Sequence, residues 1–182
     1  MDTFTLDAPS TEKGLPVDVS PGDISSHILV IGVGERHKHD EQVGLYVARR
    51  IREESGGAIR VVDETKDVLD LMELWQTADV VFVVDAVVDG KGVGAIHHFE
   101  VGPSTGCDEV IPADISFSLR VLGLADAIHL AESLNMLPAR LIVYGIEAEC
   151  FKPGEGLSLD VLAAAEQVTK EILHYVGLRH SA

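Results

Sequence analysis

The pattern of apolar and polar residues changes near residue 27. Residues 1–26 show no sustained helix or strand period and are rich in Pro, Ser and Thr, which predicts a flexible N-terminal extension. From residue 27 onward, short apolar runs alternate with segments of helical periodicity. We therefore predict a single α/β domain over residues 27–182.

Short apolar runs predict the strands. They cover residues 27–33, 58–63, 79–86, 94–101 and 140–146. The run at 79–86 is almost continuously apolar, which is typical of a strand buried on both faces. The run at 94–101 alternates apolar and polar residues and predicts a half-exposed, antiparallel edge strand.

Apolar residues at helical spacing predict the helices. They cover residues 41–54, 68–75, 117–135 and 159–176. Asp40 and Ser158 stand where side chains commonly cap the first and last of these helices.

The alternation of strand and helix predicts the fold class. It favours a three-layer α/β/α fold with a twisted, mostly parallel sheet of about five strands and right-handed crossovers. Sites in such sheets form at the carboxyl ends of strands where the strand order reverses. In the common order 2-1-3-4-5, the loop after the first strand carries Glu41 and the third strand carries Asp85. We therefore predict that these two carboxylates converge on one crevice.

Charge and cysteine content narrow the function classes. The chain has 14 Lys and Arg against 30 Asp and Glu, a formal net charge of −16. This disfavours nucleic-acid binding and docking on anionic membranes. Cys107 and Cys150 form no short Cys-x-x-Cys pair, so a disulfide framework is disfavoured and a cytoplasmic location fits. There is no apolar run of the ~20 residues that would span a bilayer, and the N-terminus does not have the pattern of a signal peptide.

The first loop, GVGERHKHDEQVG, is unusually polar. Gly32 and Gly34 resemble the start of a dinucleotide-binding fingerprint, but His37 stands where the third glycine belongs. The loop also runs several residues too long before its helix. Turn glycines and a capping Asp40 are the simpler interpretation, although they alone do not explain the polar run at 35–41.

Several other polar residues have both a possible functional role and a possible structural role. Burial of a carboxylate in a strand costs free energy unless the group is paired, hydrogen-bonded or bound to a metal. We therefore interpret Asp85 as a functional residue rather than as an ordinary turn acid. Asp63, at the end of the second strand, fits either reading equally. His97 and His98 point to opposite faces of their strand and are better explained as edge residues than as joint ligands of one metal ion.

Several segments in order carry a family resemblance. They are ILVIGVG with DEQVGLYVARRI, the strand-ending Asp63, ADVVFVVDAVVDGKGVGAIHHFE, LGLADAIHLAESLNMLPARLIVYGIE and GEGLSLDVLAAAEQV. From His27 to Leu173 the chain resembles the hydrogenase maturation proteases. The resemblance implies a cytoplasmic endopeptidase that removes the C-terminal extension of a nickel–iron hydrogenase large-subunit precursor, or of a related protein, after nickel insertion.

The resemblance also implies a metal-recognition site. Glu41 and Asp85 correspond to two of its ligands and would engage nickel that belongs to the substrate. No cofactor would be permanently bound, although other divalent ions are possible. The family's third ligand is a histidine before the segment LGLA, and Arg120 occupies that position here. Arginine has no lone pair to donate to a metal ion.

These departures leave alternatives open. His37, His39 or His98 could supply the missing imidazole. The glycine-rich turn that the family places after Asp63 is absent here, which removes backbone freedom from a loop that would handle the substrate. Asp63 and Arg120 are both candidates for substrate recognition or for the electrostatics of the site.

Three functional hypotheses follow. The first is a working endopeptidase whose catalytic group the sequence does not identify. The second is a non-catalytic homologue that binds a hydrogenase-like subunit as a chaperone or adaptor, with Arg120 paired to Glu41 or Asp85. The third is an unrelated nucleotide or small-molecule enzyme that uses Gly32 and Gly34, and it rests on fold analogy alone.

Overall fold

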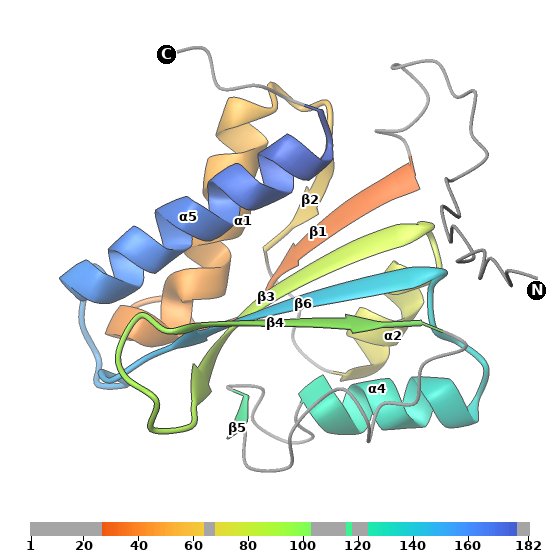
Figure 1. The fold of residues 1–182 in the computed structure, drawn as a ribbon. Helices are drawn as coiled ribbons and strands as arrows, with labels where there is room; N and C mark the ends of the chain where they lie inside the picture. The colour runs from red at the N-terminus through yellow and green to blue at the C-terminus, as the bar shows by residue number, and fades with distance from the viewer. Residues whose placement is uncertain (1–26, 64–67, 103–115, 118–123, 178–182) are drawn as a thin grey trace, which may run out of the picture.

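A computed structural model describes residues 27–63, 68–102, 116–117 and 124–177. The strands are β1 (Ile28–Gly32), β2 (Arg60–Val62), β3 (Val80–Val88), β4 (Ile96–Val101), β5 (Ser116–Phe117) and β6 (Arg140–Glu147). The helices are the 3-10 helix η2 (His39–Gln42), α1 (Val43–Glu54), α2 (Val68–Trp75), α4 (Leu124–Ser133) and α5 (Leu159–Tyr175). Figure 1 shows the strands as one twisted sheet between two layers of helices.

The sheet has the predicted mostly parallel topology. Its order is β2-β1-β3-β6-β4, and β5 adds to β3 off this path. β1, β2, β3 and β6 are parallel, whereas β4 is an antiparallel edge strand paired with β6. The predictions that the first and third strands are neighbours and that the 94–101 segment forms the antiparallel edge are both confirmed.

Two hydrophobic cores lie on opposite faces of the sheet. The core under α1 and α5 contains Phe82 and Val84, whereas the core under α2 and α4 contains Val81 and Val83. In Figure 1, α1 and α5 lie above the sheet and α2 and α4 below it. Since side chains alternate along a strand, Asp85 shares the α2/α4 side with Val83.

The prediction of a helix over 117–135 was wrong at its N-terminal end. Phe117 lies in β5, where it pairs with Val87 of β3, and the described part of α4 begins at Leu124. Helical spacing in the sequence does not reveal this pairing, because it depends on a strand distant along the chain. Residues 118–123, like the extension predicted over 1–26, lie outside the described residues.

The capping prediction was wrong for Asp40. Gln42 precedes α1, and Asp40 lies inside η2. Ser158 does stand at the N-cap of α5, but its side chain makes no capping hydrogen bond. Its hydroxyl instead donates to Asp40, because the first loop packs against the loop between β6 and α5.

Candidate functional site

β1 ends before its neighbour β3 does. Gly32 pairs with Val84, and the amide of Val33 donates to the carbonyl of Val84 at 2.8 Å, after which β1 stops. β3 continues to Val88, with β6 paired along one edge and β5 on the other from Val87. Asp85 therefore lies in β3 between the end of β1 and the start of β5.

Asp85 is fully buried. Its relative exposure is 0%, and its Oδ1 accepts a hydrogen bond from the amide of Ala86 at 2.8 Å. A buried carboxylate carries a desolvation cost that a bound cation can offset. The burial inferred from the apolar run before Asp85 is thus observed.

Glu41 reaches the same end of the sheet through a close backbone approach. η2 packs against β3. A Cβ placed on Gly44 would lie 2.2 Å from the carbonyl oxygens of both Val33 and Val84, so only glycine fits there. Glu41 lies three residues before Gly44 and Asp85 directly after Val84, so the segments that carry the two acids adjoin.

Glu41 is a buried acid with a perturbed pKa. Its exposure is 6%, and Lys38 Nζ lies 3.6 Å from its Oε2. Burial is the main cause that raises the pKa of Glu41, and the negative charge of Glu35 raises it further. Such a carboxylate gains from a nearby cation, because the ion restores the stabilisation that burial removes.

Gly32 and Gly34 have packing roles. A Cβ on Gly32 would lie 2.3 Å from the carbonyl oxygen of Gly44, and one on Gly34 would lie 2.1 Å from that of Glu41. Gly34 also has a φ of +146°. These contacts let the first loop lie on the sheet, and they explain the glycines without a nucleotide.

The first-loop histidines contact the loop between β6 and α5. His37 Nδ1 pairs with the carboxylate of Glu155, and the imidazole of His39 lies over Gly154, where a Cβ would come 1.9 Å from its Nε2. Both histidines have positive φ angles, 61° and 40°. The structure thus places both beside this neighbouring loop.

The β4 histidines face opposite ways, as the sequence indicated. His98 packs its ring against Tyr144 at a centroid distance of 4.9 Å, and Tyr144 belongs to the α1/α5 core. His97 stacks with Phe99, which packs on the α2/α4 core. His98 therefore lies on the face opposite to Asp85, and His97 lies on the same face.

Asp63 has a structural partner. Arg52 donates to both of its carboxylate oxygens at 3.0 Å. These hydrogen bonds are the main reason that the pKa of Asp63 is lowered, and the charges of Arg52 and Arg36 lower it further. This pair gives Asp63 a structural role at the end of β2. Arg120 lies outside the described residues.

Asp40 has a role that sequence reasoning missed. It is fully buried and accepts hydrogen bonds from the amides of Glu149 (3.3 Å), Cys150 (3.1 Å) and Ser158 (2.7 Å), as well as from the Ser158 hydroxyl. It ties the first loop to the loop that precedes α5. Local periodicity contains no signal for these contacts, because the partners lie more than a hundred residues further along the chain.

The sequence profile of the hydrogenase maturation protease family matches residues 42–175. The chain belongs to this family. No protein among curated sequences matches it significantly. Within the described residues, no helix combines the length and the apolar character that crossing a bilayer requires.

Solved structures of hydrogenase maturation proteases share the fold. The nickel–iron hydrogenase maturation protease HybD from Thermococcus kodakarensis superposes with a TM-score of 0.67 and 21% identity, covering 82% of this chain and 99% of that one. The hydrogenase maturating endopeptidase HybD from E. coli gives a TM-score of 0.61 and 22% identity, with 83% and 92% covered. The protease HycI from Thermococcus kodakarensis KOD1 gives a TM-score of 0.59 and 18% identity, with 86% and 97% covered. As a hydrogenase maturation protease, the chain is an endopeptidase, a hydrolase of peptide bonds.

Proposed function

We propose that this endopeptidase removes the C-terminal extension of a nickel–iron hydrogenase large-subunit precursor, or of a close relative of that subunit, once nickel has been inserted. The observation that carries the proposal is the burial of Glu41 and Asp85 on adjoining segments at one end of the sheet. We place the reaction in the cytoplasm, in keeping with the free thiol of Cys150.

In this proposal nickel arrives as part of the substrate. Glu41 and Asp85 supply oxygen ligands to the exposed side of the ion, and the ion offsets the desolvation of both acids. A carbonyl or water polarised by the ion then becomes the target or the nucleophile of peptide hydrolysis. Cleavage therefore depends on prior nickel insertion.

The third ligand is proposed to be an imidazole of the first loop. His37 and His39 lie on the same loop as Glu41, whereas His98 packs on the other face of the sheet. A turn of this loop toward a docked precursor would exchange the contacts with Glu155 and Gly154 for a bond to the metal.

The test is cleavage of a precursor loaded with nickel. Purified protein is incubated with nickel-loaded and nickel-free precursor, and the large-subunit mass is followed by mass spectrometry. We expect shortening of the loaded form only. Glu41→Gln and Asp85→Asn should each slow shortening at least about 100-fold, while the control Asp79→Asn, at a 70% exposed side chain before the start of β3, should cut at a rate within about threefold of the wild type.

The adaptor hypothesis predicts a different result. Because Arg120 replaces the family histidine, a non-catalytic homologue would bind the precursor and leave its mass unchanged. A stable complex without shortening, under conditions in which another family member cuts the same precursor, would overturn the proposed peptidase function.

A further inference from the structure

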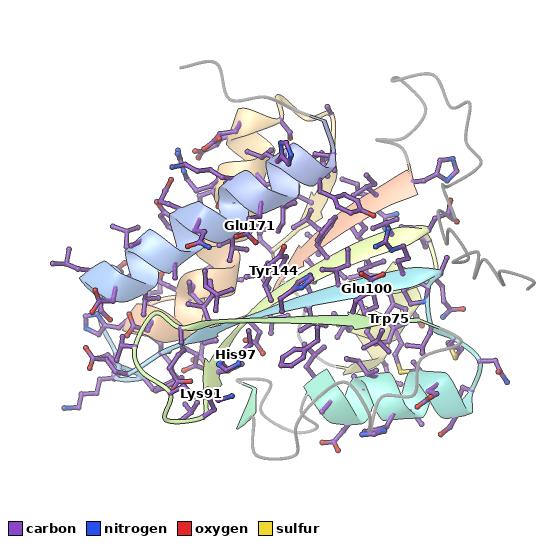
Figure 2. All side chains as sticks on the ribbon, in the orientation of Figure 1. Trp75, Lys91, His97, Glu100, Tyr144 and Glu171 are labelled. Atoms are coloured by element: carbon purple, nitrogen blue, oxygen red, sulfur yellow. The ribbon has the colours of Figure 1, made fainter. Side chains whose placement is uncertain are left out.

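A second group of metal-ligating side chains lies beyond the carboxyl ends of β3 and β6. Asp89 follows β3, His97 belongs to β4 and Glu147 ends β6. One ligand atom from each lies within 4.8 Å of the other two. Figure 2 shows His97 close to Lys91, which belongs to the loop between β3 and β4. This group shares no residue with the Glu41 and Asp85 pair.

These three side chains are almost completely buried. The side chains of Asp89 and His97 are 0% and 9% exposed, and Glu147 is 4% exposed. Asp89 Oδ2 lies 3.0 Å from His97 Nε2, yet neither atom makes a well-directed hydrogen bond within the described residues. Buried polar atoms in native proteins normally have such a partner, so this pair calls for an explanation.

The surrounding hydrogen bonds hold the two carboxylates in place. The amide of Asp89 donates to both oxygens of Glu147, at 3.1 and 2.9 Å, and the amide of Gly90 donates to Oε1 at 2.9 Å. The amide of Lys91 donates to Asp89 Oδ1 at 2.8 Å, which leaves Oδ2 directed toward His97. Support of this kind orients metal ligands.

The charge of Asp89 has a neighbouring cation. Lys91 Nζ lies 3.0 Å from Oδ2 and balances part of this charge. Its side chain is 58% exposed and can turn into solvent when an ion binds.

We propose that Asp89, His97 and Glu147 form a site for a resident divalent transition-metal ion of the zinc type, separate from the nickel that the substrate carries. One imidazole nitrogen with two carboxylate oxygens suits Zn²⁺, which binds three protein ligands and a water molecule. Imidazole disfavours Mg²⁺ and Ca²⁺, which prefer oxygen ligands alone.

The ion would join three segments near the candidate site. Asp85, Gly145 and His97 pair in one row across β3, β6 and β4. Gly145 carries no side chain, and Asp85 and His97 lie on the same face. An ion held by His97 and Asp89 would therefore fix the edge strand β4 and the β3–β4 loop next to the part of β3 that contains Asp85.

The test uses the full chain after removal of metals with a chelator. Isothermal titration with Zn²⁺ should show one site, and Mg²⁺ should bind at least about 100-fold more weakly. His97→Gln and Asp89→Asn should each weaken Zn²⁺ binding at least about 100-fold. His98→Gln, a substitution at the neighbouring residue on the opposite face, is the matched control and should leave affinity within about twofold.

Two further measurements make the result decisive. With Co²⁺ in place of Zn²⁺, His97→Gln should remove the intense visible absorption bands of four-coordinate Co²⁺, a readout that holds even if Asp89→Asn fails to fold. The double variant Glu41→Gln/Asp85→Asn should keep the Zn²⁺ site while losing precursor cleavage, so the two proposals fail independently. Zn²⁺ affinity that is unchanged in His97→Gln, or lost in the double variant instead, would overturn the inference.

Discussion

At the scale of single residues, two adjacent acids show how local contacts set a carboxylate's chemistry. Asp40 and Glu41 are both buried. Burial acts to raise the pKa of Asp40, but hydrogen bonds from Ser158, Cys150 and Glu149 together lower it. Burial and Glu35 raise the pKa of Glu41. Asp40 thus stabilises the fold as an anion, whereas the raised pKa of Glu41 shows that its anion is less stable in the folded protein, where an added cation would stabilise it.

Replacement of Glu41 should separate stability from activity. Because the folded state binds the proton of Glu41 more tightly than the unfolded state, its ionised form costs stability at neutral pH. We expect Glu41→Gln to gain up to about 1 kcal/mol at pH 7, or about 2–4 °C in Tm, while cleavage is lost. The gain should fade as pH falls through the raised folded-state pKa of Glu41 and should be absent below the usual Glu value of 4.5. Thermal unfolding at pH 4 and pH 7 measures both, and a lower Tm at pH 7 would contradict this account.

Asp40 should show the opposite dependence on pH. We expect Asp40→Asn to lose about 3 kcal/mol at pH 7, because an amide nitrogen meets the donors that the carboxylate accepted. With the folded-state pKa below the usual Asp value of 3.8, the wild-type advantage is full above that pH and is lost as pH falls through the folded-state pKa. Urea unfolding from pH 3 to pH 7 measures it. Asp79→Asn, at a 70% exposed side chain, is the control, and an equal loss there would contradict the assignment.

At the scale of elements, the entry into α1 depends on close backbone contact. Gly44 lies against the carbonyl oxygens of Val33 and Val84, and Gly32 lies against the carbonyl of Gly44. This packing lets η2 reach β3 and brings Glu41 next to the segment of Asp85. Gly32, one of the two glycines that suggested a nucleotide-binding loop, thus helps to position Glu41.

A side chain at Gly44 should displace this entry. We expect Gly44→Ala to lose about 3 kcal/mol, because its Cβ would overlap two carbonyl oxygens that belong to the backbone. Chemical denaturation measures the loss. Gly102→Ala, where a Cβ would come no closer than 3.2 Å to one carbonyl oxygen, is the control. Equal stability of the two variants would show that the backbone of the first loop shifts to accept a side chain at residue 44, which would contradict this prediction.

At the scale of the whole molecule, negative charge dominates. A formal net charge of −16 on 182 residues implies self-repulsion in the folded state that salt screens. Ion pairs such as Arg52–Asp63 and Arg140–Glu100 offset this repulsion locally. The balance of charge therefore bears on stability and on the choice of partner, but not on the fold.

Salt should stabilise the protein. We expect Tm to rise by about 2–4 °C between 10 mM and 300 mM sodium chloride, because screening relieves more repulsion than it weakens attraction. Differential scanning calorimetry at pH 7 and again near the pI of 4.7 measures it. The rise should shrink near the pI, and a fall in Tm at pH 7 would show that surface ion pairs outweigh the net charge.

Local sequence patterns alone predicted five of the six strands in the described residues, most of the helices, the parallel order around β1 and β3 and the burial of Asp85. These features follow from local periodicity and from the rule that parallel strands end at one edge of a sheet. The sequence also indicated the family, through segments spread over most of the chain.

Which polar groups meet depends on how distant segments of the chain pack together. Asp40 reaches Ser158, 118 residues away, β5 extends the edge of β3, and Asp89, His97 and Glu147 converge from three strands and their ends. Periodicity reports which face a residue occupies, but a contact between distant segments depends on loop paths and strand register. Those are set by the packing of the whole molecule.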